Sequence, residues 1–292
     1  MIPTPRESWI CPNAQCREPF RAPEVRCVVC GASLGYPNVR VANTPSEVEA
    51  LEARYRLARR DVEQRGCKDL LEKFEVAVQK SKAVVCRSLN IVAQLVLSDD
   101  PLYSTYYKAV DQESRRIDLS AIDNDRRATD VLMFPGYHEH IVFAALSVDG
   151  FGNRDYGRCS LVLRDMAVQG RASVFEKNSV TFCREHVIGV GRPVPPGHRA
   201  TWDRRHLLAA VKVATRLDPT VKPADFPRLL LSQRSKTRES DFMEVHIYGP
   251  IHRRALEVVH LPRPRQNNDG DVAITMQIES ALEEAGVKVK LH

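Results

Sequence analysis

Four cysteines near the start of the chain have the spacing of a metal-binding module. They stand in the pattern C-x4-C-x10-C-x2-C and are Cys11, Cys16, Cys27 and Cys30. A Cys-x-x-Cys turn directs two sulfurs at one point, and the following Gly31 permits the left-handed backbone that lets amide groups face the thiolates. Four thiolates leave no open coordination position. We therefore expect a structural zinc site whose metal supplies most of the folding free energy of this segment.

Two histidines form a second group that can do chemistry. His138 and His140 are two residues apart at the start of a predicted strand, so both imidazoles should lie on one face. Cys183 and His186 would complete a second zinc site, and a phosphodiester hydrolase could use such a metal. Motifs of P-loop, Rossmann, α/β-hydrolase and zinc-deaminase proteins are absent from the sequence.

A succession of short motifs between residues 131 and 260 forms a third group of residues that can do chemistry. A histidine leads into a strand, Asp155-Tyr156-Gly157 opens another, and Arg171-Ala172-Ser173 and Asn178-Ser179 follow. The series ends in D-F-M-E-V-H-I-Y-G over residues 241–249. This succession resembles the ADP-ribosyltransferase superfamily, with toxin-like bacterial members nearest. The resemblance implies a split antiparallel sheet that clamps NAD.

The resemblance also implies roles for individual residues. Glu244 would be the catalytic carboxylate. The residues that would bind NAD are His138, His140, Tyr156, Ser173 and Ser179. Cleavage of the bond to nicotinamide develops positive charge on the ribose, and a carboxylate stabilises that charge as in glycoside hydrolysis. The family's Ser-Thr-Ser is absent, and Phe242 stands where many transferases have Glu or Gln, which leaves the acceptor of ADP-ribose undefined.

Helical periodicity follows the cysteine module. Ser46 and Glu49 form a capping box, and apolar residues continue at spacings of three and four to Val62. After Gly66, a second apolar stripe contains Leu71, Phe74, Val78, Val85, Val92 and Leu95. The pattern predicts two helices that pack as an antiparallel hairpin.

The pattern becomes strand-like after a polar interval at about residues 111–130. Predicted strands cover residues 141–148, 160–163, 173–175, 180–183, 243–248 and 256–261, and residues 206–217 should form a helix. We therefore expect an α+β fold in three parts. These are a zinc ribbon at 1–42, a helical region at 43–112, and an antiparallel split-sheet α+β domain at 130–292 that would bind NAD.

Composition limits the class of protein. Hydrophobic residues make up 43% and charged residues 27%, as in ordinary globular chains. The sequence shows no signal peptide and no membrane-spanning run, so we expect a cytoplasmic protein without membrane contact. Eight cysteines in a reducing compartment favour metal binding over disulfides. The net charge is +6, and basic clusters at 204–205, 234–238 and 253–254 favour a polyanionic partner.

Two functions agree with these observations. The first is an intracellular NAD-dependent ADP-ribosyltransferase or NAD glycohydrolase, with NAD as substrate and the zinc ribbon as a recognition module. The alternative is a non-enzymatic zinc-ribbon protein that binds nucleic acid or a protein partner through the ribbon and the basic clusters. The sequence does not decide between enzyme and binding protein, and it does not indicate the oligomeric state.

Overall fold

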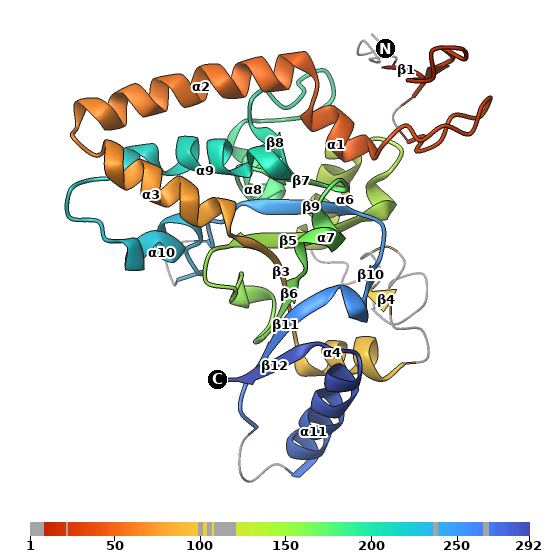
Figure 1. Ribbon diagram of the computed structural model, residues 1–292, viewed down its shortest axis with the longest axis vertical. Coiled ribbons are helices and arrows are strands. Elements are labelled where there is room, and N and C mark those ends of the chain that lie inside the picture. Colours follow the sequence, from red (N-terminus) through yellow and green to blue (C-terminus); the bar gives the residue numbers. More distant parts are fainter. Residues whose placement is uncertain are drawn as a thin grey trace.

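A central twisted sheet organises the chain, as a computed structural model shows for residues 9–21, 23–98, 102–103, 107, 121–235, 239–264 and 269–292. The described part contains eight strands in this sheet, with helices on both faces (Figure 1). Their spatial order is β12 (Lys288–Leu291), β11 (Leu256–Leu261), β6 (Cys159–Leu163), β3 (Lys82–Arg87), β5 (Ile141–Ser147), β9 (Glu244–Tyr248), β7 (Ala172–Phe175) and β8 (Arg199–Thr201).

Neighbouring strands run antiparallel except at one edge. β11 and β12 are parallel, so the sheet is mixed, and the expectation of a purely antiparallel sheet is wrong for this pair. The register aligns side chains across strands on one face. Val84, Ala145, Glu244 and Phe175 form one such row across β3, β5, β9 and β7.

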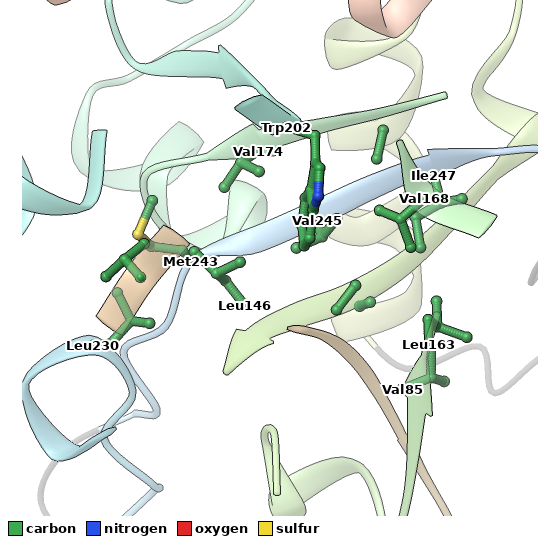
Figure 2. Close-up of a cluster of buried hydrophobic side chains, with 14 of the residues drawn as sticks. Val85, Leu146, Leu163, Val168, Val174, Trp202, Leu230, Met243, Val245 and Ile247 are labelled. Atoms are coloured by element: carbon green, nitrogen blue, oxygen red, sulfur yellow. The ribbon is translucent and has the colours of Figure 1, made fainter. Parts of the chain in front are cut away.

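The first face of the sheet carries the main hydrophobic core. Val85, Leu146, Val174, Val245 and Ile247 point into it from the strands (Figure 2). The strands alternate because successive side chains of an extended chain point to opposite faces. The helices that contribute to this core are α2 (Pro45–Gln64), α3 (Lys68–Gln79), α4 (Leu89–Leu97), α7 (Asp165–Val168), α9 (Arg205–Val213), α10 (Phe226–Leu230) and α11 (Asp269–Glu284).

The second face is covered differently along its length. Over β5, β9 and β7, the helices α6 (Ala121–Met133) and α8 (Ser179–Glu185) contribute to a smaller core that includes Phe134, Tyr137 and Phe182. Over β3 and β6, the segment 149–157 crosses the sheet, and the Phe151 carbonyl accepts a hydrogen bond from Ser160 Oγ at 2.7 Å. The second face therefore has a helix-covered half and a loop-covered half.

The structure confirms the α+β class and most predicted elements. The first predicted helix is α2, the helix at 206–217 is α9 followed by a 3₁₀ turn, and five predicted strands are β5, β6, β7, β9 and β11. The second helix of the hairpin is wrong, because α3 ends at Gln79 and the chain continues as β3 and α4. The strand at 180–183 is also wrong, because Asn178 caps α8 there by accepting a bond from the Thr181 amide.

Strand β3 changes the predicted domain organisation. It belongs to the expected helical region 43–112, yet it lies between β6 and β5 in the sheet. The segment 43–112 therefore supplies part of the same sheet as 130–292. Most of the predicted boundary between them, residues 108–120, lies outside the described residues.

An ion pair between Arg54 and Glu176 connects α2 with the end of β7. Arg54 donates two hydrogen bonds to the Glu176 carboxylate, at 2.7 and 3.0 Å, and His198 Nδ1 lies 2.8 Å from the same group. Burial opposes ionisation of Glu176. The bonds from His198 and Arg54 outweigh it and lower the pKa of Glu176 to about 2.

This pKa predicts an acid-sensitive contribution to stability. A depressed pKa means that the unfolded chain binds more protons below the ordinary Glu pKa, so the contribution is complete above about pH 5 and is lost as the pH falls toward 2. A shift of this size corresponds to about 3 kcal/mol. Glu176→Gln should lower the unfolding free energy at pH 7 and reduce its pH dependence between pH 5 and 2, measured by urea denaturation. Glu185→Gln, in an exposed pair with Lys177, should change neither, and equal acid slopes for wild type and Glu176→Gln would contradict the assignment.

Candidate functional site

The four cysteines of the N-terminal module lie together. Two short strands, β1 (Trp9–Ile10) and β2 (Pro19–Phe20), form a hairpin, and the four sulfurs lie within 4.8 Å of one another. The Cys11 and Cys30 sulfurs are 3.6 Å apart, and those of Cys16 and Cys27 are 3.7 Å apart. Gly31 has φ of +72°, in the left-handed region that its position requires. Such a closed group of four thiols can hold a metal ion.

The cysteine module, residues 9–35, has a small core of its own and is attached to α1 (Pro37–Ala42). Phe20 and Leu34 are buried against its cysteines. The guanidinium of Arg40, from α1, lies 5.4 Å from the Trp9 ring centroid and 4.9 Å from that of Phe20. Arg40 also donates to the carbonyls of residues 24, 34 and 35. The module is therefore held to α1, which in turn packs on the sheet.

The histidines proposed for a second metal do not gather with Cys183 in the described part of the chain. His138 and His140 lie in a 3₁₀ turn before β5, so their predicted place on the strand is wrong. The Tyr107 ring meets His138 edge-on at 4.9 Å, and the Tyr248 ring lies 5.3 Å from His140. Among the described residues, the cysteine group at the N-terminus is the cluster that meets the geometry of a metal site.

Glu244 lies at the centre of a buried polar network. Its side chain, on the second face at the start of β9, belongs to a residue that is only 2% exposed. Oε1 accepts from Asn178 Nδ2 at 2.9 Å and from Arg126 Nη1 at 3.3 Å. Oε2 accepts from the Ser179 amide at 3.0 Å and from His246 Nε2 at 3.1 Å. All four lone-pair positions of the carboxylate are thus occupied.

These contacts keep Glu244 ionised. Burial alone would favour the neutral acid, but the charge of Arg126 and the bond from His246 lower the pKa of Glu244 to about 2. Burial lowers the pKa of His246, so its imidazole is neutral and its Nε2 carries the proton that it donates. A neutral donor and a cation therefore share one buried anion.

A second carboxylate completes the charge cluster. Arg126 Nε lies 3.0 Å from Asp130 Oδ1, one helical turn later on α6, and Tyr107 donates to Asp130 Oδ2 at 3.0 Å. Burial raises the pKa of Asp130, with the negative charge of Glu244 adding to the effect. The guanidinium of Arg126 also lies 3.7 Å from the Phe143 ring centroid. One arginine thus bridges two buried carboxylates on an aromatic surface.

The sheet opens beside Glu244. β3 pairs with β5 from Lys82 to Val84, and from Val84 to Arg87 it pairs with β6. Ala145, the last β5 residue paired with β3, also lies opposite Glu244. In Figure 1, β5 and β9 cross the upper half of the sheet, while β6 and β11 turn downward. The carboxylate therefore lies where the two halves of the sheet diverge.

The structure brings some of the predicted NAD-binding residues to Glu244 and leaves others apart. Ser179 touches the carboxylate through its amide, and Tyr156, half exposed in the turn η2 (Arg154–Tyr156), is close enough for the charge of Glu244 to raise the pKa of its hydroxyl beyond the effect of burial. Ser173 lies opposite His246, one strand away. His140 precedes the far end of β5, about 17 Å along the strand from Ala145.

Arg126, Asp130 and His246 were not predicted as site residues. His246 stood inside the motif that ends the resemblance, two residues after Glu244 and hence on the same face of the strand. Arg126 and Asp130 have the i, i+4 spacing of a helical ion pair, which was the available signal. Asn178 belongs to the motif Asn178-Ser179, in which the resemblance assigned a role only to Ser179.

Comparison with known proteins adds no relative. The chain matches no known protein family, and no curated protein is significantly similar to it. In the described residues, every helix is too short or too polar to cross a membrane. The site must therefore be interpreted from its own geometry.

Asn38 connects the N-terminal segment to this site. It is buried in α1, and its amide donates to the His246 carbonyl at 2.9 Å and to the Arg171 carbonyl at 3.1 Å. These bonds hold β9 two residues from Glu244. The predicted zinc-ribbon segment 1–42 thus includes a helix that packs on β7, β8 and β9.

Truncation should separate the contribution of the cysteine module to stability from that of α1. A chain lacking residues 1–35 retains Asn38 and should unfold cooperatively, whereas a chain lacking 1–42 leaves two carbonyls without their donor and should lose roughly 2 kcal/mol or more of unfolding free energy relative to it. Urea denaturation followed by circular dichroism measures both. Asn38→Ala in the full chain should reproduce the larger loss. Equal midpoints for the two truncations would contradict the role of Asn38.

Proposed function

We propose that this chain is an NAD-consuming enzyme, an ADP-ribosyltransferase or NAD glycohydrolase, in which Glu244 is the catalytic carboxylate. The observation that supports it is a buried, ionised glutamate at the divergence of the two halves of the sheet. Buried charged groups whose pKa values are strongly shifted are typical of active sites. The sequence resemblance independently points to the same residue.

The local chemistry agrees with cleavage of a nicotinamide–ribose bond. The reaction needs a fixed negative charge beside a ribose that becomes cationic, and the donors around Glu244 hold such a charge in a site shielded from water. Ser179 Oγ and Arg126 Nη2 are buried polar atoms without hydrogen-bond partners among the described residues. They offer positions for the hydroxyl groups of a bound sugar.

A substrate hydroxyl must replace one of the four donors to Glu244. Arg126 makes the longest of the four contacts, and its side chain is 19% exposed, more than the 3% of the other ring or guanidinium donor, His246. Its remaining bond to Asp130 would hold it nearby. We therefore assign to Arg126 the role of the group that releases Glu244 and then faces the negatively charged part of NAD.

The cysteine group is proposed to bind zinc. Zinc–sulfur bonds of about 2.3 Å in a tetrahedron place sulfurs about 3.8 Å apart, close to the two measured separations of 3.6 and 3.7 Å. This site is structural, because it offers no open position for substrate.

The non-enzymatic alternative is supported by a different feature. Val28 and Val29, at the tip of the Cys-x-x-Cys turn, are 81% and 64% exposed, and Ile10 is 52% exposed. Exposed apolar residues on a metal module can contact a partner protein. This reading explains the module but assigns no role to the network around Glu244.

Replacement of Glu244 tests the proposed enzyme. Glu244→Gln should slow nicotinamide release from NAD at least about a hundredfold, since the charge that stabilises the transition state is lost. It should also lower stability by a few kcal/mol, because buried Arg126 loses one of its two counter-charges and keeps only Asp130. The rate of nicotinamide release is measured at temperatures below the midpoint of thermal unfolding, with and without cell lysate as a source of acceptors.

Two further variants separate catalysis from folding. The triple variant Glu244→Gln, Arg126→Met, Asp130→Asn removes the whole buried charge cluster and should recover stability but not activity. Glu72→Gln, on α3 at the opposite face, should keep wild-type rates. A folded wild-type chain that neither binds nor consumes NAD, with or without lysate, would disprove the proposed reaction.

Metal analysis tests the zinc assignment. The purified chain should contain one zinc ion, and Cys27→Ser or Cys30→Ser should abolish tight binding because an incomplete tetrahedron loses affinity. Inductively coupled plasma mass spectrometry measures the stoichiometry. Cys67→Ser, at a buried cysteine outside the module, is the matched control. Full zinc occupancy in both module variants would disprove this ligand set.

A further inference from the structure

The loop-covered half of the second face ends in an exposed basic surface. Its charged side chains are exposed and come from the turn η2, the segment before β6, and β12. We name this surface the β12 basic face, and it consists of Arg154, Arg158, Lys288 and Lys290. It lies at the edge of the sheet that Figure 1 shows beside the C-terminal end.

Strand register shows why these residues share one face. Lys288 pairs with Val258, and Val258 pairs with Val162, which belongs to the buried cluster of the second face. Lys290 pairs in the same way with His260, which lies opposite Ser160. Paired residues point to the same side of a sheet, so both lysines lie on the second face.

The segment 149–157 adds cations and flat groups to this surface. The Phe151 ring packs on His260 with centroids 4.7 Å apart, and the Arg154 guanidinium lies 4.4 Å from the Phe151 centroid. Tyr156, two residues further, is 52% exposed. Its ring packs on Phe242 with centroids 6.0 Å apart and lies near the charge of Glu244, so the flat groups beside the lysines of β12 are the Arg154 guanidinium and the Phe151 ring below it.

In the described part of the chain, the cations of this surface are not held in ion pairs, and the carboxylate beside Arg154, that of Asp155, accepts a hydrogen bond from the Arg234 amide. Within the described residues, Arg154, Arg158 and Lys290 form no ion pair within 4 Å. Burial lowers the pKa of His260, and the positive charges of Lys290 and Arg154 lower it further. The acidic neighbour Asp149 accepts bonds from Ser147 and the Phe151 amide, which turn its carboxylate toward the loop.

We propose that the β12 basic face binds single-stranded nucleic acid. The lysines and arginines would contact phosphates, and the Arg154 guanidinium, which lies over the Phe151 ring, would stack on a base, as in proteins that bind single strands without sequence preference. An acidic peptide would match the charge but would make no use of the flat groups. A duplex hides its bases, so the single strand is the better match.

The surface and the candidate catalytic residue share one face. The row that begins at Lys288 continues through Val258, Val162, Val84 and Ala145 to Glu244. Glu244 is four strands from Val258, a separation of about 19 Å. An oligonucleotide bound on the β12 basic face would therefore extend toward the proposed NAD site. Its binding does not depend on whether that site is catalytic.

Fluorescence anisotropy with a labelled oligothymidylate of about 12 nucleotides tests the proposal. The full chain should bind it more tightly than a duplex of equal length, with affinity falling as salt rises from about 50 to 200 mM. The triple variant Arg154→Glu, Arg158→Glu, Lys290→Glu should weaken binding roughly tenfold or more and reduce the salt slope by about 2, since each phosphate contact on a single strand contributes about 0.7.

A matched charge change on the opposite face is the control. Lys68→Glu, Lys73→Glu, Lys80→Glu alters three exposed lysines of α3 and its C-cap by the same total charge, and it should bind like wild type. Circular dichroism should show both variants folded. Equal weakening by the two variants, equal competition by polyglutamate, or no binding at low salt would overturn the proposal. The Glu244→Gln variant should bind the oligonucleotide normally, so a failed NAD assay and a failed binding assay are distinguishable.

Discussion

The buried negative charge of Glu244 is the constraint to which the second face of the sheet is fitted. A carboxylate removed from water is unstable unless cations and donors surround it. Three separate elements meet that need, because α6 supplies Arg126, the start of α8 supplies Asn178 and the Ser179 amide, and β9 supplies His246. The positions of α6 and α8 over the sheet follow from these bonds as well as from the apolar cluster around Phe134.

Asn38 extends this constraint to the N-terminal segment. Its bond to the His246 carbonyl fixes β9, the strand that carries Glu244. Arg40, two residues later, contacts the aromatic rings of the cysteine module and donates to its backbone carbonyls. Helix α1 therefore connects the cysteine module with the charge cluster around Glu244.

The sequence predicted the features that depend on residues close together in the chain, and it missed those that depend on distant residues. The cysteine pattern, the apolar spacing of α2 and the alternation in β9 are local, and the sequence alone indicated them. The predicted capping box of Ser46 and Glu49 is wrong, because α2 begins at Pro45 with Thr44 as its N-cap and has no side-chain cap bond. β3 was read as helix because the seven-residue spacing from Val78 to Val85 fits a helical stripe, whereas Ala83, Val85 and their neighbours are buried by the sheet. The pair of Arg126 and Glu244 spans 118 residues, and no local pattern joins them.

The position of β3 has a consequence for how the chain folds during synthesis. This strand lies in the interior of the sheet, but both of its neighbours, β5 and β6, begin more than fifty residues later in the chain. At translation rates of about 5–20 residues per second, β3 waits for several seconds with its apolar edges unpaired. Contacts so distant in sequence also slow folding, because loop closure precedes the gain from pairing. The nascent chain therefore passes through a period in which the Ala83–Cys86 segment is open to wrong partners and to chaperones.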